Sequence, residues 1–118
     1  MTNPLALIIE DDPKLSDIFA VSLRAANFDT EIVTDGPAAL IRLEEIIPTI
    51  IILDLHLPGL SGEKILAWVR ADERFAQTHI LLATADAQAA DALQGQADLV
   101  LLKPISPLQL RDLAARFR

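Results

Sequence analysis

Carboxylate side chains follow two short apolar runs of the sequence. The acidic triplet Glu10-Asp11-Asp12 closes the run Leu5–Ile9, and Asp54 closes the run Ile50–Leu53. In an open parallel sheet, ligands lie beyond the carboxyl ends of the strands. Carboxylates that converge there repel one another, so they need a cation or an ammonium group beside them. Because Mg²⁺ prefers oxygen ligands and takes only one or two carboxylates, the pattern predicts a magnesium site beside a reactive aspartate.

Two further polar residues end later apolar runs. Thr84 ends the run that includes Ile80–Leu82, and Lys103 follows Leu99–Leu102. A single polar residue after a strand is most often a helix cap or a turn residue, and a single lysine is most often a surface residue. The joint placement of such residues after four apolar runs is what favours a functional site at one edge of a sheet.

The elements that would position these residues follow from the apolar periodicity. We expect strands at residues 5–9, 30–33, 49–53, 80–82 and 99–102. Apolar residues at helical spacing predict helices from residue 13 through 23, over 39–47, from 65 through 69, over 86–93 and over 110–117. Five such β–α units predict an α/β fold, a parallel sheet covered by helices on both faces.

The composition narrows the function classes. The net charge of −7 argues against a nucleic-acid surface, which needs a basic patch. No apolar stretch reaches the ~20 residues of a bilayer span, and no signal-peptide pattern is present. The absence of cysteine excludes disulfides and cysteine-bound zinc and fits a reducing compartment. We expect a single domain over residues 1–118 and a cytoplasmic location.

The motifs that carry the polar residues resemble those of the receiver domain of two-component response regulators. They are Leu7-Ile8-Ile9-Glu10-Asp11-Asp12-Pro13, the stretch Leu53–Gly62, Ala83-Thr84-Ala85 and Leu102-Lys103-Pro104. The resemblance covers essentially the whole chain. It implies a flavodoxin-like, doubly wound (βα)5 fold with a five-stranded parallel sheet in the order 2-1-3-4-5.

The resemblance implies a role for each acidic residue. Asp54 matches the aspartate that receives a phosphoryl group from a sensor histidine kinase or a histidine phosphotransfer protein, forming an acyl phosphate. Asp11 matches a direct Mg²⁺ ligand, for which Mn²⁺ can substitute, and Glu10 matches the acid that holds metal-bound water. The backbone carbonyl of His56 matches the third protein ligand. Asp12 we interpret as the cap of the first helix.

Lys103 resembles the family lysine that pairs with the phosphoryl group, and Thr84 resembles the switch hydroxyl that moves to a phosphoryl oxygen. The Lys–Pro bond is often cis in the family, which would direct the lysine toward the site. The His56 side chain lies where family members tune dephosphorylation, but we favour a solvated loop residue. We expect Trp68 to pack partly on a neighbouring surface, and His79 has no partner pattern.

Two features depart from the family pattern. Receivers usually carry Tyr or Phe three residues before the lysine, and Val100 stands there. A valine cannot turn between solvent and a pocket as the aromatic does. The segment between Thr84 and Lys103 is also about one helical turn shorter than is common. Both departures concern the face through which receivers pass on their signal, so we expect intact phosphorylation chemistry with an altered readout.

We therefore expect a phosphoacceptor of a phosphorelay that acts on a downstream protein or output domain, and not a metabolic enzyme, a membrane-inserted protein or a direct nucleic-acid binder. The main alternative is an atypical receiver that works as a constitutive interaction module with weakened switching. A haloacid-dehalogenase-type phosphohydrolase would need a second aspartate at position 56, where His56 stands. A flavin mononucleotide site would need a phosphate-binding loop after the first strand, and the chain has none there.

Overall fold

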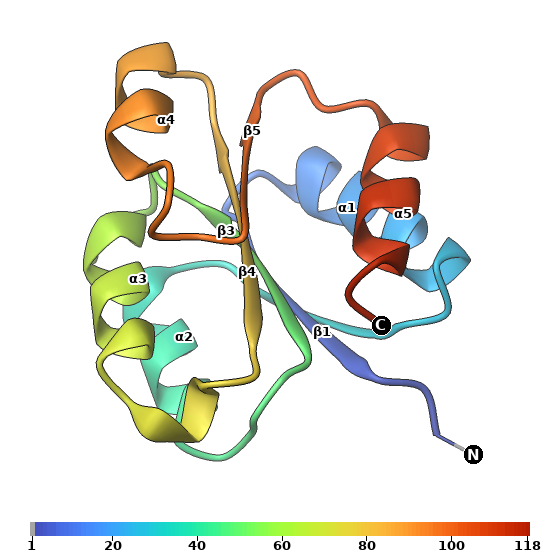
Figure 1. Cartoon of the computed structure of the whole chain (residues 1–118), viewed down its shortest axis with the longest axis horizontal. Helices are drawn as coiled ribbons and strands as arrows, with labels where there is room; N and C mark the ends of the chain where they lie inside the picture. The colour runs from blue at the N-terminus through green and yellow to red at the C-terminus, as the bar shows by residue number, and fades with distance from the viewer. Residues whose placement is uncertain (1) are drawn as a thin grey trace.

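The computed structural model describes residues 2–118 and consists of five β–α units (Figure 1). The strands are β1 (Leu5–Ile9), β2 (Asp29–Val33), β3 (Ile50–Asp54), β4 (His79–Thr84) and β5 (Leu99–Leu102). The helices are α1 (Pro13–Ala25), α2 (Gly36–Leu43), α3 (Gly62–Arg70), α4 (Ala87–Leu93) and α5 (Pro107–Ala115), with a 3₁₀ turn, η1, at Glu73–Phe75.

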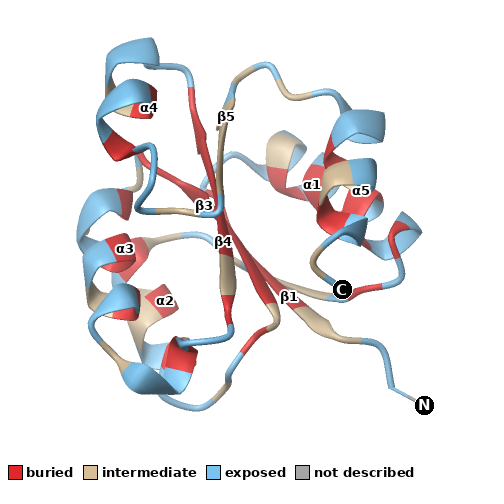
Figure 2. Cartoon of the chain, viewed as in Figure 1, coloured by how far each residue is buried: buried red, intermediate tan, exposed pale blue. Residues whose placement is uncertain are grey.

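The five strands form one parallel sheet in the order β2-β1-β3-β4-β5, which confirms the predicted flavodoxin-like topology. The central strands β1 and β3 are buried almost throughout (Figure 2). A parallel sheet is covered on both faces, so its inner strands are apolar at consecutive positions and do not alternate. The runs Leu5–Ile9 and Ile50–Leu53 have this composition for that reason.

Two hydrophobic cores lie on the two faces of the sheet. Helices α2, α3 and α4 cover one face, and α1 and α5 cover the other (Figure 1). Successive strand residues contribute to opposite cores, so that Leu7 and Ile51 face α2 and α3 while Ile8 and Ile52 face α1 and α5. The sheet is thus held rigidly from both sides, and its carboxyl edge is a fixed platform for the polar residues.

The helices begin at capping side chains. The caps are Asp12, Asp35, Ser61, Asp86 and Ser106 for α1 to α5 in order. The Asp12 carboxylate accepts hydrogen bonds from the N–H groups of Lys14 and Leu15, at 2.9 and 3.4 Å. The interpretation of Asp12 as a helix cap is therefore confirmed, and this residue is occupied outside the acidic site.

Two predicted helices end earlier than their apolar spacing indicated. Helix α2 ends at Leu43, and Ile47 is exposed beyond it. Ile47 precedes Pro48, and a residue before proline is restricted from helical backbone angles, so the chain leaves the helix before this point. Helix α5 ends at Ala115, and Phe117 lies past its end while still packing on the α1–α5 core. The 3₁₀ turn η1 was not predicted.

The connection between α4 and β5 is short. Helix α4 has seven residues, of which only Ala90 and Leu93 are buried. The chain then turns at Gly95, whose φ of 91° lies in the left-handed region that glycine adopts without strain. The segment between Thr84 and Lys103 is therefore short because α4 is small and the turn after it is tight. Within residues 2–118 no helix combines the length and apolar character that crossing a membrane requires.

Candidate functional site

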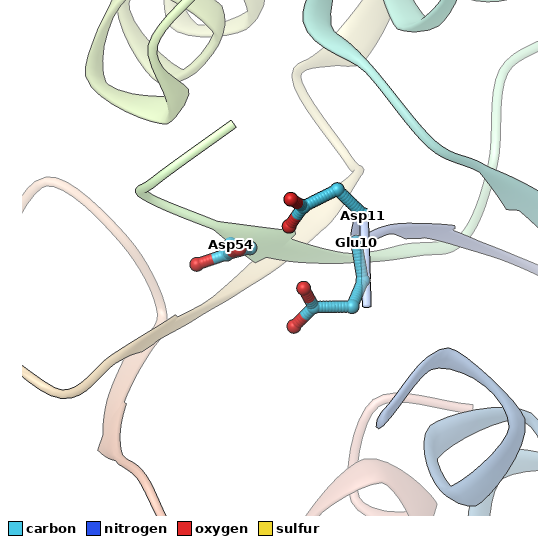
Figure 3. Close-up of side chains that lie close together, drawn as sticks. All are labelled: Glu10, Asp11 and Asp54. Atoms are coloured by element: carbon cyan, nitrogen blue, oxygen red, sulfur yellow. The ribbon is translucent and has the colours of Figure 1, made fainter. Parts of the chain in front are cut away.

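Three carboxylates converge beyond the carboxyl ends of β1 and β3 (Figure 3). Ile9 is in register with Leu53, so the residues that follow them emerge side by side at the same edge. One carboxylate oxygen from each of Glu10, Asp11 and Asp54 lies within 4.8 Å of the other two. Glu10 is 1% exposed and Asp54 is 3% exposed, whereas Asp11 is open to solvent. The site is therefore a buried acidic pocket with one accessible carboxylate at its mouth.

Lys103 supplies the one ammonium group that reaches this pocket among the described residues. Its Nζ lies 2.9 Å from Glu10 Oε1 and 3.3 Å from Asp54 Oδ1. The residue follows β5, and its N–H donates to the Thr84 carbonyl at 2.8 Å. The peptide bond from Lys103 to Pro104 is cis, as the resemblance implied. The lysine therefore bridges two carboxylates that come from β1 and β3.

The electrostatics of the pocket are those of an acidic excess. Burial raises the pKa of Glu10 to about 7, against the effect of the Lys103 ammonium, and the nearby Asp54 adds to the rise. Burial lowers the pKa of Lys103, but the Glu10 and Asp54 carboxylates outweigh it, so that this pKa is raised. The site thus holds three carboxyl groups and one ammonium, which contacts two of them. This oxygen-only donor set with unbalanced negative charge fits a hard divalent cation.

The backbone around Asp54 fixes the position of its carboxylate. The His56 N–H donates to Asp54 Oδ1 at 3.1 Å, and the Leu55 N–H donates to the Ala83 carbonyl at 3.2 Å. Helix α3 begins against this segment, because Gly62 has no side chain. A Cβ at this position would lie 2.7 Å from the Leu55 Cα and would clash with the Asp54 carbonyl. Glycine is therefore required where α3 packs on the end of β3.

Thr84 lies at the end of β4, fully buried, beside β3. Its hydroxyl accepts a 3.0 Å hydrogen bond from the Asp86 N–H, at the beginning of α4. The His56 side chain is exposed, which agrees with the solvated loop residue that we favoured. The roles of Glu10, Asp11, Asp54, Thr84, Lys103 and the His56 carbonyl in metal binding and phosphorylation stay predictions.

Val100 occupies the position where an aromatic residue is usual. It is half-buried, packs on the core beneath α3 and α4, and is in register with Leu82. A fixed aliphatic side chain thus fills the place of the mobile aromatic. Trp68 also packs as expected, on Phe75 with ring centroids 5.8 Å apart.

Sequence reasoning missed a cluster of polar residues at the opposite edge of the sheet, formed by Arg70, His79 and Asp98. Asp98 accepts hydrogen bonds from the Arg70 guanidinium at 2.9 Å and from the Ile80 N–H at 2.7 Å. His79 Nδ1 lies 3.2 Å from the second Asp98 oxygen, and its ring packs on Phe117 at a tilt of 40°. These residues are far apart in the sequence and share no motif, so no local signal could have joined them.

Comparison with known proteins identifies the family. The model of the response regulator receiver domain matches residues 6–115. The chain is 35% identical over 115 residues to the DNA-binding response regulator MtrA of Mycolicibacterium smegmatis, which covers 95% of this chain and 48% of that protein. It is 36% identical over 118 residues to the DNA-binding dual master transcriptional regulator RpaA of Synechocystis, covering 98% and 48%. The chain spans about half the length of the curated relatives it matches.

Solved structures agree with this assignment. A putative response regulator of Chloroflexus aurantiacus has a TM-score of 0.90 at 26% identity, over 98% of both chains. The receiver domain of a sensor histidine kinase of Pseudomonas aeruginosa has a TM-score of 0.86 at 27% identity, also over 98% of both, and its structure holds a magnesium ion in the active-site cleft. The family match, the parallel sheet and the acidic pocket lead to one conclusion: this chain belongs to the response regulator receiver domain family of two-component signalling proteins.

Proposed function

We propose that this receiver accepts a phosphoryl group on Asp54 from a sensor histidine kinase or a histidine phosphotransfer protein, in a reaction that depends on Mg²⁺. The phosphorylated state then controls a downstream protein or output domain. One observation carries the proposal. Asp54 ends β3 with its carboxylate buried, 3.3 Å from the Lys103 ammonium, and one of its oxygens lies within 4.8 Å of one oxygen each of Glu10 and Asp11.

The contacts of Asp54 suit a nucleophile. Its Oδ1 atom accepts from the His56 N–H and contacts the Lys103 ammonium, so the carboxylate has a fixed orientation. The Oδ2 atom is left to attack the phosphorus of the donor phosphohistidine, so that the P–O bond of the acyl phosphate forms as the P–N bond breaks and the histidine imidazole leaves. Positioning of this kind supplies much of the catalysis in phosphoryl transfer.

The acidic pocket would hold the divalent cation. Asp11, Asp54 and the His56 carbonyl are the direct ligands in this proposal, and Glu10 acts through water; Mn²⁺ can replace Mg²⁺. The ion supplies positive charge that offsets the charge on the transferred phosphoryl oxygens. Lys103 adds a second positive charge and pairs with the phosphoryl group after transfer.

Thr84 supplies a hydrogen bond to the product. Its hydroxyl oxygen is occupied by the Asp86 N–H, while its own proton remains able to turn toward a phosphoryl oxygen. Movement toward the phosphoryl group would therefore pull on the beginning of α4. This contact is the route by which phosphorylation reaches the α4 side of the receiver.

We infer a signalling phosphoacceptor and not a metabolic enzyme, because the position that a phosphohydrolase fills with an acid holds the exposed His56. We do not expect residues 2–118 to bind nucleic acid. The net charge of −7 opposes it, and the relatives named as DNA-binding are about twice as long as the matched region.

Mass spectrometry of the intact protein tests the proposal. Incubation with acetyl phosphate and Mg²⁺ is expected to add one labile phosphoryl group, and chelation of the metal to prevent it. Asp54→Asn keeps the size of the side chain but removes the nucleophile, so labelling should vanish. Asp12→Asn is the matched control, since Asp12 caps α1. A labelled peptide that contains Asp11 or Asp12 but not Asp54 would disprove the assignment.

A second candidate function is a constitutive interaction module with weakened switching. It is favoured by Val100, which packs in place of the usual aromatic, and by the seven-residue α4. This second function would be supported if the receiver becomes phosphorylated and its affinity for the partner stays the same.

A further inference from the structure

A groove lies between the outer edge of β2 and the adjacent face of α2, outside the acidic pocket. Its volume is about 410 Å³, and its apolar lining comes from Ile32, Val33, Ala38 and Ile41. Ile41, on α2, is 62% exposed. Ile32 lines the groove at the strand edge, since its register with Ile8 places its side chain on the α1 face of the sheet. The fold therefore leaves a concave apolar surface uncovered at this edge of the sheet.

The groove runs along an unpaired strand edge. Strand β2 pairs only with β1 in the described sheet. The Asp29 N–H donates to the carbonyl of Pro4, just before β1, at 2.9 Å, and the Val33 carbonyl accepts from the N–H of Glu10, just after β1, at 3.0 Å. The odd-numbered residues of β2 therefore direct their backbone hydrogen bonds toward β1. Because backbone groups alternate in direction along a strand, Thr30 and Ile32 present theirs to the open side. Such an edge can pair with an added strand.

The edge is acidic. Residues 29–45 contain one basic side chain and five acidic ones, which are Asp29, Glu31, Asp35, Glu44 and Glu45. The basic residue, Arg42, contacts both Glu31 and Glu45 at 3.0 Å, so its charge is already shared between two partners. The hydrogen bond from Arg42 lowers the pKa of Glu31, which stays charged. The other three carboxylates, those of Asp29, Asp35 and Glu44, form no ion pair with a basic residue of this segment.

We propose that this groove binds an extended segment of a partner protein with alternating apolar and basic side chains. Alternate side chains of a strand added to β2 would point into the groove. Apolar ones would cover Ile41, and basic ones would lie against this acidic segment, of which Glu31 and Glu45 line the groove.

Other occupants fit the edge less well. A second copy of the chain would bring one acidic edge against another, and nucleic acid or an anionic lipid surface would be repelled. The N-terminal residues Thr2–Pro4 line a different pocket, together with Ala115 and Arg118. The proposal is independent of Asp54, because the groove contains no residue of the acidic site.

Nuclear magnetic resonance titration tests the proposal on the isotope-labelled receiver. The probe is a short end-blocked peptide of alternating valine and lysine, and the matched peptide has glutamate in place of lysine. We expect the lysine peptide to shift the amides of Thr30, Ile32 and Ile41 and to slow hydrogen exchange at the first two. The glutamate peptide should leave them unchanged. No change along β2 at millimolar peptide would overturn the proposal.

A pair of isoleucine variants separates the groove from general attraction between charges. Ile41→Glu should weaken binding of the lysine peptide by about tenfold, since it removes the apolar contact. Ile47→Glu adds the same charge at a residue that is 59% exposed and lies outside the groove, and it should bind as the wild type does. Both should unfold like the wild type and label with acetyl phosphate. Equal affinity of the two variants for the peptide would refute the groove.

Discussion

The ammonium group of Lys103 lies closer to Glu10, at 2.9 Å, than to Asp54, at 3.3 Å. The lysine is thus shared between the two carboxylates, and its shorter contact is with the one that we propose to hold metal-bound water. Glu10 also accepts a 3.2 Å hydrogen bond from the Asp12 N–H. A cation in the pocket or a phosphoryl group on Asp54 would change the charges that Lys103 experiences. The lysine is therefore placed to respond to both.

The first prediction concerns Glu10 and pH, in the absence of divalent metal. Burial raises the pKa of Glu10 from 4.5 to about 7, so the folded state binds this proton more tightly than the unfolded state does. The stability contributed by Glu10 is then complete below pH 4.5 and is lost as the pH rises through 7. We expect a loss of about 3 kcal/mol over this range, measured by urea unfolding with a chelator present.

Glu10→Gln removes the titrating group and should flatten that pH dependence. Glu63→Gln is a suitable control, because Glu63 is exposed on α3 and its substitution should leave the slope unchanged. Identical slopes for wild type and Glu10→Gln would contradict the assigned electrostatics of the pocket.

The second prediction concerns the metal. Asp11 is the accessible carboxylate of the three, so Asp11→Ala removes a proposed direct ligand while leaving the buried pair in place. We expect calorimetry to give weak Mg²⁺ binding for the wild type and at least about tenfold weaker binding for the variant. Asp17→Ala, an exposed substitution on α1, serves as the control. Equal affinities of wild type and Asp11→Ala would exclude Asp11 as a ligand.

The third prediction concerns the readout. With Val100 fixed in the core and α4 short, beryllofluoride bound at Asp54 should shift amides near Asp54, His56 and Ala83–Asp86. The shifts should fade before Leu99–Leu102, because only contacts that differ between two states can change their populations. Asp54→Asn should show none of them. Large shifts throughout β5 and α5 would show that the receiver switches fully without the aromatic residue.

The fourth prediction concerns Asp98, at the opposite edge of the sheet. Burial raises the pKa of Asp98, but the bonds from the Ile80 N–H, His79 and Arg70 outweigh it and lower this pKa from 3.8. Its stabilising effect is therefore present above pH 3.8 and is lost as the pH falls through the lowered value. Asp98→Asn should cost about 1–2 kcal/mol at pH 7.

The cost of Asp98→Asn should shrink in acid, and acetyl phosphate labelling should be unaffected, since Asp98 lies away from the pocket. Chemical denaturation at neutral and acidic pH measures the cost of Asp98→Asn in the free energy of unfolding, with Asp17→Asn as control. A cost that is constant with pH would show that the charge of Asp98 is not what stabilises the fold.

Local patterns predicted most of this fold, because its determinants are local. The buried strands have consecutive apolar residues, and the caps Asp12 and Asp86 directly precede their helices. The acidic residues were expected to lie together because parallel strands end at a common edge. The predicted end of α2 was wrong, because the apolar spacing continues to Ile47 whereas Pro48 disfavours helical backbone angles at the residue before it. The Arg70–Asp98 contact joins residues 28 positions apart and has no sequence signature.

The close packing at Gly62 couples the predicted phosphorylation site to a helix mechanically. No side chain separates the beginning of α3 from the backbone of Asp54 and Leu55. A displacement of the end of β3 would therefore displace α3 as well. The single tryptophan of the chain, Trp68, lies on that helix and against Phe75 of η1. Rotation of α3 would alter the contact between these two rings. The fluorescence emission of Trp68 would then report a change at the end of β3 without any movement of Val100.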